Sequence, residues 1–160
     1  MSAPRPPVEA DLLPLTTLWA EGWHEAHAAF VPADLVAHRT EDSFRTRLRR
    51  KWKKLRVTGP EGAPTGFCAI HDDELDQLFV SSAARGTGAA AQLLADAEER
   101  LAASGVTRAF LLCLPENDRA RRFYERHGWV YDVTRDEAVE TLAGPFTLRT
   151  AIYRKALTPR

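Results

Sequence analysis

Residues 78–94 constrain the fold of this chain more than any other stretch. An apolar run ends at Val80, small and polar residues follow, and an alanine- and leucine-rich helical pattern starts directly after two closely spaced glycines, Gly86 and Gly88. This order predicts a strand, a loop and a helix. Without side chains at the glycines, the first amides of the helix are open to a ligand, and the helix dipole favours an anion such as phosphate or pyrophosphate. Arg85 adds a positive charge.

Two other classes of phosphate-binding loop can be compared with this stretch. A P-loop requires a lysine shortly after its glycines, but no lysine follows Gly88 before Lys155. A dinucleotide fold fits better, because Gly86 to Ala91 match its looser glycine fingerprint. Its acidic ribose partner is expected about twenty residues on, whereas Glu116 lies further away and little chain remains for more βαβ units. A nucleotide-dependent oxidoreductase that binds NAD(P) therefore stays an alternative function for this loop, ranked second to the one described next.

A second informative stretch runs from Asn117 to Trp129. It follows an apolar strand pattern and has helical spacing, with Asn117 as the expected N-cap and Gly128 as the C-terminal stop. Together with residues 85–90 it resembles the GNAT superfamily of acyl-CoA-dependent N-acetyltransferases. In that family, Arg/Gln-x-x-Gly-x-Gly/Ala holds the coenzyme A pyrophosphate and is followed by Asn-x-x-Ala-x-x-Phe-Tyr-x-x-x-Gly-Phe/Trp. Both patterns occur here in that order, and the resemblance is densest over residues 66–129.

The resemblance implies an α/β (α+β) fold. Residues 1–160 would form one domain, with a mixed, mostly antiparallel sheet that is splayed in its middle and flanked by about four helices. The first strand of the family would be short or degenerate here, because the start of the chain is rich in proline. The patterns predict helices at 11–28, 33–52, 89–103 and 117–127, and strands at 55–58, 66–70, 74–80, 107–114, 129–135 and 146–155.

The resemblance also implies acetyl-CoA as co-substrate, with no metal. The coenzyme would contact the end of one strand, the glycine loop and the second helix. Asn117, Arg121 and Tyr124 are spaced i, i+4 and i+7, which predicts one shared helix face. The expected coenzyme-binding residues are Leu78, Phe79, Val80, Arg85, Gly86, Thr87, Gly88, Ala89, Ala90, Asn117, Arg121 and Tyr124.

Three residues are candidates for catalysis. The resemblance makes Tyr124 the proton donor to the leaving thiolate, and an ungapped alignment puts Glu74 where some members have the base that deprotonates the amine, with Asp76 as substitute. On a regular strand, Glu74 and Asp76 would share a face with Leu78 and Val80. A splayed strand end would also leave backbone donors free to polarise the thioester carbonyl. The structural alternatives are a packed tyrosine and an exposed hairpin carboxylate.

The acceptor amine is the least defined part of the function. In the family, the first two helices cover the acceptor cleft, which makes Trp23, His24 and His27 candidate substrate contacts. Acidic residues near the cleft favour a cationic amine, in a small molecule or at a protein N-terminus or lysine. Residues 45–56 carry eight basic side chains in twelve positions. They form either a solvated helix face or a docking surface for phosphates, so aminoacyl-tRNA is an alternative.

Composition narrows the remaining classes. Twenty-two basic and twenty-two acidic side chains cancel, which disfavours a dedicated nucleic-acid or membrane-surface protein. No apolar stretch has the length of a membrane span, and Cys68 and Cys113 lie in strand-like apolar runs typical of buried free thiols. We therefore expect a cytoplasmic protein. The last two predicted strands, at 129–135 and 146–155, are expected to form a closing hairpin. This hairpin could form part of the substrate pocket or a homodimer interface. A non-catalytic acyl-CoA-binding regulator is a third functional alternative.

Overall fold

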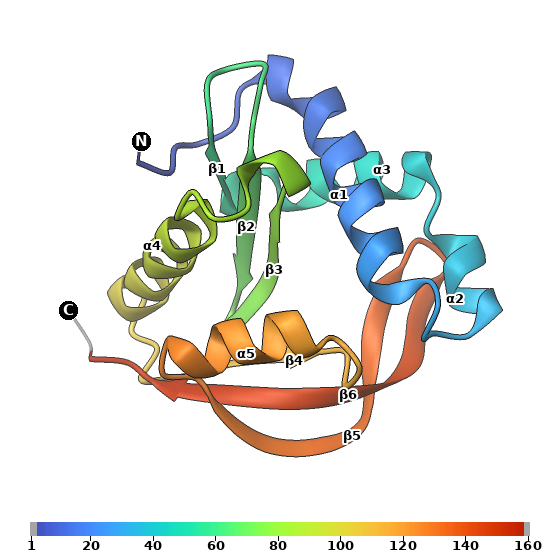
Figure 1. The fold of residues 1–160 in the computed structure, drawn as a ribbon, viewed down its shortest axis with the longest axis vertical. Helices are drawn as coiled ribbons and strands as arrows, with labels where there is room; N and C mark the ends of the chain where they lie inside the picture. The colour runs from blue at the N-terminus through green and yellow to red at the C-terminus, as the bar shows by residue number, and fades with distance from the viewer. Residues whose placement is uncertain (1–2, 159–160) are drawn as a thin grey trace.

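A computed structural model describes residues 3–158 of the chain, so the ends of the predicted domain, residues 1, 2, 159 and 160, lie outside the described residues. Six strands form one sheet in the order β1-β2-β3-β4-β6-β5, with helices on both faces (Figure 1). The elements are α1 (Leu12–His27), α2 (Ala33–His38), α3 (Glu41–Lys51), β1 (Leu55–Thr58), β2 (Gly66–His71), β3 (Glu74–Val80), α4 (Ala89–Ala103), β4 (Arg108–Cys113), α5 (Asp118–Arg126), β5 (Val130–Thr141) and β6 (Gly144–Ala156).

The sheet consists of two antiparallel halves that meet along one short parallel seam. Strands β1, β2 and β3 form one half, and β4, β6 and β5 form the other. At the seam, β3 pairs with β4 only through Glu74 and Phe110. Beyond this pair the two strands diverge, as Figure 1 shows. The predicted α/β class and the splayed, mostly antiparallel sheet are therefore confirmed, and the edge of β3 that faces β4 is free to contact a ligand.

Two hydrophobic cores, one on each face of β1–β3, hold the helices in place. The first lies between the sheet, α4 and α5 and includes Leu93, Leu101 and Trp129. The second lies under α1 and α3, where Trp19 and Phe44 have ring centroids 5.0 Å apart. Each such fully buried side chain contributes about 1.5–3 kcal/mol. Both cysteines are buried and free as expected.

The predicted helix over residues 33–52 is wrong in one respect, because it is broken at Arg39 and Thr40. Thr40 is the N-cap of α3, and its side chain accepts a hydrogen bond from the Ser43 amide at 3.2 Å. This cap competes with a continuous helix and favours a new start. The break turns Arg39 inward, where its Nη1 donates to the Glu140 carbonyl at 2.7 Å.

The predicted alternation along β3 is also wrong, because the strand contains a bulge at Asp76. Ile70 of β2 pairs with Leu75, but the preceding Ala69 pairs with Gln77, so Asp76 is an extra residue in β3. A bulge of this kind reverses the side-chain alternation on one side of it. Leu75 therefore packs in the same core as Leu78 and Val80, and Glu74 faces the opposite side.

The closing hairpin is longer than the sequence predicts. Strands β5 and β6 have 12 and 13 residues, and they are joined at Leu142 and Ala143. Most of the segment between the two predicted strands, residues 136–145, therefore belongs to a strand. Its tip rises beside α2 (Figure 1). This brings Glu140 next to α3.

The N-terminal segment replaces the family's first strand with a single pairing. Arg5 bridges Val57 of β1, which confirms a degenerate first strand. Arg5 Nη1 also donates to the buried Asp11 at 2.8 Å, and Asp11 accepts from the Gly62 amide at 2.9 Å. Across residues 3–158, no helix has the length and apolar character that crossing a membrane requires.

Candidate functional site

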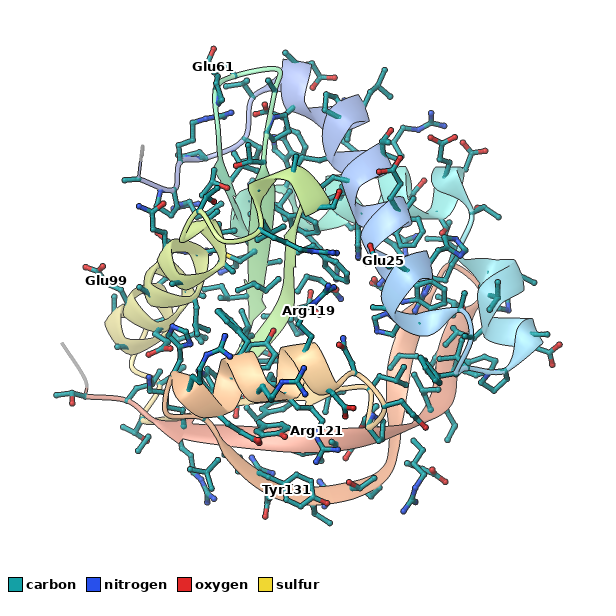
Figure 2. All side chains as sticks on the ribbon, viewed as in Figure 1. Glu25, Glu61, Glu99, Arg119, Arg121 and Tyr131 are labelled. Carbon is teal, nitrogen blue, oxygen red and sulfur yellow. The ribbon has the colours of Figure 1, made fainter. Side chains whose placement is uncertain are left out.

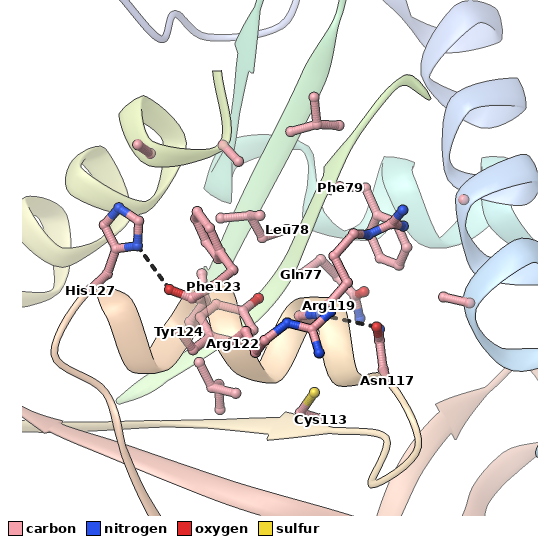
Figure 3. Close-up of a pocket in the computed structure, with 18 of the residues that line it drawn as sticks. Gln77, Leu78, Phe79, Cys113, Asn117, Arg119, Arg122, Phe123, Tyr124 and His127 are labelled. Atoms are coloured by element: carbon pink, nitrogen blue, oxygen red, sulfur yellow. Dashed lines mark hydrogen bonds between the residues drawn. The ribbon is translucent and has the colours of Figure 1, made fainter. Parts of the chain in front are cut away.

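A cavity of about 600 Å³ occupies the gap between β3 and β4. We call it the loop cavity; its walls are β3, the end of β4, most of residues 84–91, α5 and part of α1. Figure 3 shows Leu78 and Phe79 on one side and Asn117, Phe123 and Tyr124 on the other. Most of the predicted coenzyme-binding residues line it: Leu78, Phe79, Val80, Arg85, Gly86, Gly88, Ala89, Ala90, Asn117 and Tyr124.

The start of α4 forms one end of the loop cavity. Gly88 is the N-cap of this 15-residue helix and has φ +86°, and Gly86 has φ +79°. Left-handed backbone of this kind favours glycine. A Cβ at Gly86 would meet no atom within 4 Å, so its backbone conformation rather than crowding requires glycine. Thr87 does not line the loop cavity; its hydroxyl donates to the Ala84 carbonyl and stabilises the turn.

Arginines surround the loop cavity at its mouth. Arg85 Nη2 lies 3.0 Å from both carboxylate oxygens of Glu25, and Arg119 Nη1 lies 3.9 Å from one of them. Arg122 and Arg126 also line the loop cavity and are exposed. Arg119, Arg122 and Arg126 were not among the predicted binding residues, although their spacing of i, i+3 and i+7 is a recognisable signal for one helix face. Together with the helix N-terminus they attract anions.

Arg121, in contrast, is not brought to the loop cavity. Its Nε donates to the Tyr153 hydroxyl at 2.8 Å, and its Nη1 donates to the Pro115 carbonyl at 2.9 Å. Figure 2 shows Arg119 and Arg121 on different sides of α5. The predicted shared face is therefore found only in part: Tyr124 and Asn117, the N-cap whose side chain accepts from the Ala120 amide at 3.3 Å, line the loop cavity, but Arg121 does not.

Tyr124 lies in the wall of the loop cavity, packed edge-on against Phe123 and Trp129 with ring centroids 5.4 and 6.3 Å away. Burial raises the pKa of its hydroxyl well above the ordinary value. Among the described residues the hydroxyl has no hydrogen-bond partner. The phenol therefore stays protonated at neutral pH and is free to donate a proton to a group bound in the loop cavity.

A second cavity of about 450 Å³ lies on the other side of β3, between α1, α3 and the closing hairpin. We call it the basic cavity, because its walls include Arg39, Arg47, Arg50, Lys51 and Lys54. It is not separate from the first one. Asp76, Gln77, Phe79 and Cys113 line both cavities, so the two meet where β3 and β4 diverge.

Two of the candidate catalytic residues, Glu74 and Asp76, lie in the wall of the basic cavity. Burial, and next the charge of Asp76, raise the pKa of Glu74 to about 8. Asp76 is partly buried and accepts from Lys51 Nζ at 2.7 Å. A carboxyl group that exchanges its proton near neutral pH is suited to act as a general base. Its place in the basic cavity follows from the bulge, which turns Glu74 away from the face of Leu78.

Residues 45–56 are neither a uniform solvated face nor a uniform docking surface. Arg45 is exposed, but Arg47 is only 3% exposed, and its guanidinium carbon lies 4.4 Å from the Trp19 ring centroid. Arg47 Nε donates to Glu140 Oε1 at 2.8 Å, and Lys51 Nζ lies 3.3 Å from the same oxygen. The helix therefore directs two cations inward, toward the basic cavity.

Of the three predicted substrate contacts, the structure places two in the wall of a cavity and one outside it. Trp23 and His27 line the basic cavity, with their rings stacked at 5.0 Å and an interplanar angle of 2°. Burial lowers the pKa of His27 to about 4, so its ring is neutral at pH 7. His24 does not line either cavity. Its Nε2 lies 3.0 Å from the Arg39 carbonyl, which makes it a support for Arg39.

Within residues 3–158, no cluster of three or more histidine, cysteine, aspartate or glutamate side chains has a metal-binding arrangement. What the two cavities combine is a protonated phenol on one side of the diverging strands and a titratable carboxyl group on the other. This arrangement can move a proton off one group and onto another across the gap.

Comparisons with known proteins agree with this geometry. The family model described as Acetyltransferase (GNAT) family matches residues 19–129. The solved structure of a GCN5-related N-acetyltransferase from Rhodopseudomonas palustris has a TM-score of 0.73, 20% identity and 98% coverage of both chains. PaiA N-acetyltransferase from Thermoplasma acidophilum, in complex with coenzyme A, has a TM-score of 0.69 and 17% identity, covering 98% of this chain and 99% of that one. No curated protein sequence matches the chain.

Proposed function

Because the chain belongs to the acetyltransferase (GNAT) family and is thus an acyltransferase that uses acetyl-CoA, we propose that it moves the acetyl group to a primary amine by direct attack in a ternary complex. The loop cavity holds the coenzyme and the basic cavity holds the acceptor. This assignment extends the family membership to the individual residues of the site. Membership of the acetyltransferase (GNAT) family disfavours the alternative of an NAD(P)-dependent oxidoreductase.

The residues of the loop cavity fit coenzyme A. At its mouth, Arg85, Arg119, Arg122 and Arg126 and the amides at the start of α4 match a group with several phosphates. Further in, the wall is formed by apolar side chains such as Leu78 and Val80 and by the edge of β3 that β4 leaves unpaired. An extended arm can hydrogen-bond to such an edge as an added strand would. The thiol end would then lie near Tyr124.

The proposed reaction assigns one role to each polar group. Acetyl-CoA supplies a thioester carbonyl and a thiolate leaving group. Glu74, directly or through water, accepts a proton from the amine, whose nitrogen then forms a bond to the carbonyl carbon. Free β3 amides polarise the carbonyl oxygen, and as the carbon–sulfur bond breaks, the Tyr124 hydroxyl gives its proton to the sulfur. The products are the N-acetylated amine and coenzyme A with a free thiol.

The observation that carries this proposal is the wall that the two cavities share. Asp76, Gln77, Phe79 and Cys113 line both cavities at the point where the strands diverge, with Tyr124 on one side and Glu74 on the other. Two reactants held on opposite sides of such a gap react without the entropic cost of finding each other in solution. Asp76 is a weaker candidate for the base because Lys51 already pairs with it.

Two measurements test the proposed function. Calorimetry of the protein with acetyl-CoA should detect binding, whereas NAD should give none; the reverse result would establish the dinucleotide alternative. Release of free thiol from acetyl-CoA should then depend on an added amine. Binding of acetyl-CoA without thiol release for any amine would favour the non-catalytic regulator.

Three expectations from the sequence stay part of the proposal. We infer a single domain because strands spread over residues 55–156 form one sheet, and the N-terminal segment pairs with it through Arg5 and Val57. We infer the cytoplasm because both buried cysteines are free, which suits a reducing compartment. A homodimer through the closing hairpin remains a prediction, and sedimentation analysis would test it.

A further inference from the structure

We propose that the acceptor is a small amino acid, and that Arg39 and Arg47 bind its carboxylate while Glu74 receives a proton from its amine. This inference rests on the proposed function, since it identifies the substrate class of the basic cavity. It is carried by two buried guanidinium groups that the protein itself leaves incompletely paired.

Arg39 is a buried cation without a carboxylate partner. Its side chain lines the basic cavity and is 5% exposed, and among the described residues it takes part in no ion pair. Nη1 donates to a backbone carbonyl, that of Glu140, and Nε has no hydrogen-bond partner in the described part of the chain. A buried charge is strongly destabilising unless an opposite charge compensates it. An anionic ligand would provide that charge.

Arg47 lies beside Arg39 and is also incompletely paired. Its Nε donates to Glu140 Oε1, but its Nη1 is buried and has no partner among residues 3–158. The same Glu140 oxygen lies 3.3 Å from Lys51 Nζ, so one carboxylate serves two cations. The repulsion is visible in Arg39, where burial and then the charge of Arg47 lower the pKa to about 10. The two guanidinium groups therefore share a deficit of negative charge.

The basic cavity as a whole also has more positive than negative side chains. Five basic side chains and three carboxyl groups line it, and one of the three, Glu74, binds a proton near neutral pH. A purely cationic amine would add to the positive charge. An amine that also bears a carboxylate is close to neutral, and it places a negative group where the cavity lacks one. The planar guanidinium fork also matches a carboxylate in geometry.

The two ends of the ligand site are linked through Lys51. Its Nζ lies 2.7 Å from Asp76, at the amine end, and 3.3 Å from Glu140, which contacts Arg47 at the anion end. This chain of direct contacts places the proposed amine and carboxylate positions a few side-chain contacts apart. The short separation of these two positions and the cavity volume of about 450 Å³ suit a small molecule, and they do not require a polynucleotide or a protein as the acceptor.

The inference can be tested with matched acceptors. The panel contains the twenty α-amino acids, β-alanine and γ-aminobutyrate, the carboxamide of each, the decarboxylated amines and the aminophosphonate of alanine. Thiol release should have a kcat/KM for the best amino acid about 30-fold or more above that of its carboxamide, because a buried ionic hydrogen bond is lost. If the aminophosphonate of alanine reacts as well as alanine does, the site also accepts anions other than a carboxylate, and this result would support an anion-binding site at Arg39 and Arg47.

Arg39→Gln and Arg39→Lys separate recognition from folding. The glutamine variant should lower kcat/KM for the best amino acid about 30-fold and that of its carboxamide less than threefold, and the lysine variant should recover part of the loss. Calorimetry with that amino acid and with coenzyme A lacking the acetyl group, which cannot react, should show the same loss of affinity. Arg45→Gln, an exposed change on α3, is the matched control and should change neither value.

The outcomes distinguish this inference from the proposed function. If acetyl-CoA does not bind, the proposed function is overturned and this inference falls with it. If acetyl-CoA binds and thiol is released equally well with the carboxamides, the decarboxylated amines or a peptide N-terminus, only the amino acid inference is overturned. An Arg39→Gln variant that binds coenzyme A normally and retains its preference for carboxylates would also overturn it.

Discussion

The two cavities of this protein are built from different kinds of sequence. The loop cavity comes mostly from two stretches, residues 75–91 and 111–127, with three residues of α1, and its binding groups are backbone amides and exposed arginines. The basic cavity collects charged side chains from β3, β5, α3 and the segments on either side of α3. Backbone groups at a helix start can be specified locally, by glycines and small side chains. Compensating charges must be brought together from distant elements.

This difference shows which of the two binding sites could form in any chain with the same short motifs and which is specific to this chain. A helix N-terminus and a splayed strand edge serve any chain with the same short motifs. The Arg39, Glu140 and Lys51 contacts depend on the helix break at Thr40, the bulge at Asp76 and the length of the closing hairpin. Variants on the two sides should therefore have separable effects, on coenzyme or on acceptor.

The largest effect is expected on the acceptor side, from Glu74→Gln. Loss of a positioned general base lowers kcat by about 10²–10⁴, while the Kd for acetyl-CoA stays within about twofold because Glu74 lies in the basic cavity. Steady-state kinetics and calorimetry measure the two quantities. Glu61→Gln, an exposed change at the turn between β1 and β2 (Figure 2) that lines neither cavity, is the control. A Glu74→Gln enzyme with unchanged kcat would exclude Glu74 as the base and favour Asp76.

The pH dependence sharpens the same prediction. The ratio of kcat/KM for wild type to that for Glu74→Gln should rise about tenfold per pH unit below pH 8 and level off above it, because Glu74 has a pKa of about 8. Stability should change in the opposite sense. The folded state favours protonated Glu74, so wild type loses stability relative to the variant as the pH rises from about 4.5 to 8. Chemical denaturation across this range measures that trend.

Tyr124→Phe is expected to have the next largest effect, on the coenzyme side. Without the hydroxyl the leaving thiolate receives no proton from the enzyme, and kcat should fall about 10²-fold, with little change in acetyl-CoA affinity. Tyr131→Phe removes an exposed hydroxyl and should leave kcat unchanged. If Tyr124→Phe instead weakens acetyl-CoA binding at constant kcat, the tyrosine is a packing residue and the comparison between the two sides must be revised.

A smaller effect is predicted for the mouth of the loop cavity. Arg122→Gln removes one of four arginines and should raise the Kd for acetyl-CoA about tenfold, the value of one charge-assisted contact, without changing the KM of the acceptor. The increase should shrink at high salt because the side chain is exposed. Arg108→Gln, also exposed but outside both cavities, tests whether net charge alone is responsible. Equal effects from both substitutions would argue against a specific phosphate contact.

Much of the fold could be predicted because its elements carry local signals. The stripe of α4, the cap at Asn117 and the glycine stops fix helices through contacts a few residues apart. The break before α3 was predictable in principle, since Thr40 precedes two acidic residues in the pattern of an N-cap. The bulge in β3 was not, because a bulge is defined by the register against β2 and leaves no clear local signal.

The candidate site divides in the same way. Tyr124 and the loop glycines followed from motifs, whereas the position of Arg121 depends on a partner distant in the sequence, Tyr153 of β6. The basic residues 45–56 were visible as a run, but which of them are buried depends on what packs against them. Nothing in the sequence marks Arg39, since a single arginine in a polar stretch gives no sign that the closing hairpin will cover it.

By itself, the sequence determined the order of the elements and the existence of an anion-binding helix start, because both depend on interactions between near neighbours in the chain. Only the tertiary structure decided which face of β3 carries Glu74 and which arginines are buried and incompletely paired. These properties depend on strand register and on burial. The register of β3 is set by its pairing with β2, at residues five to eight positions away, and Arg39 is covered by the closing hairpin, 101 positions away; neither arrangement leaves a local pattern in the sequence.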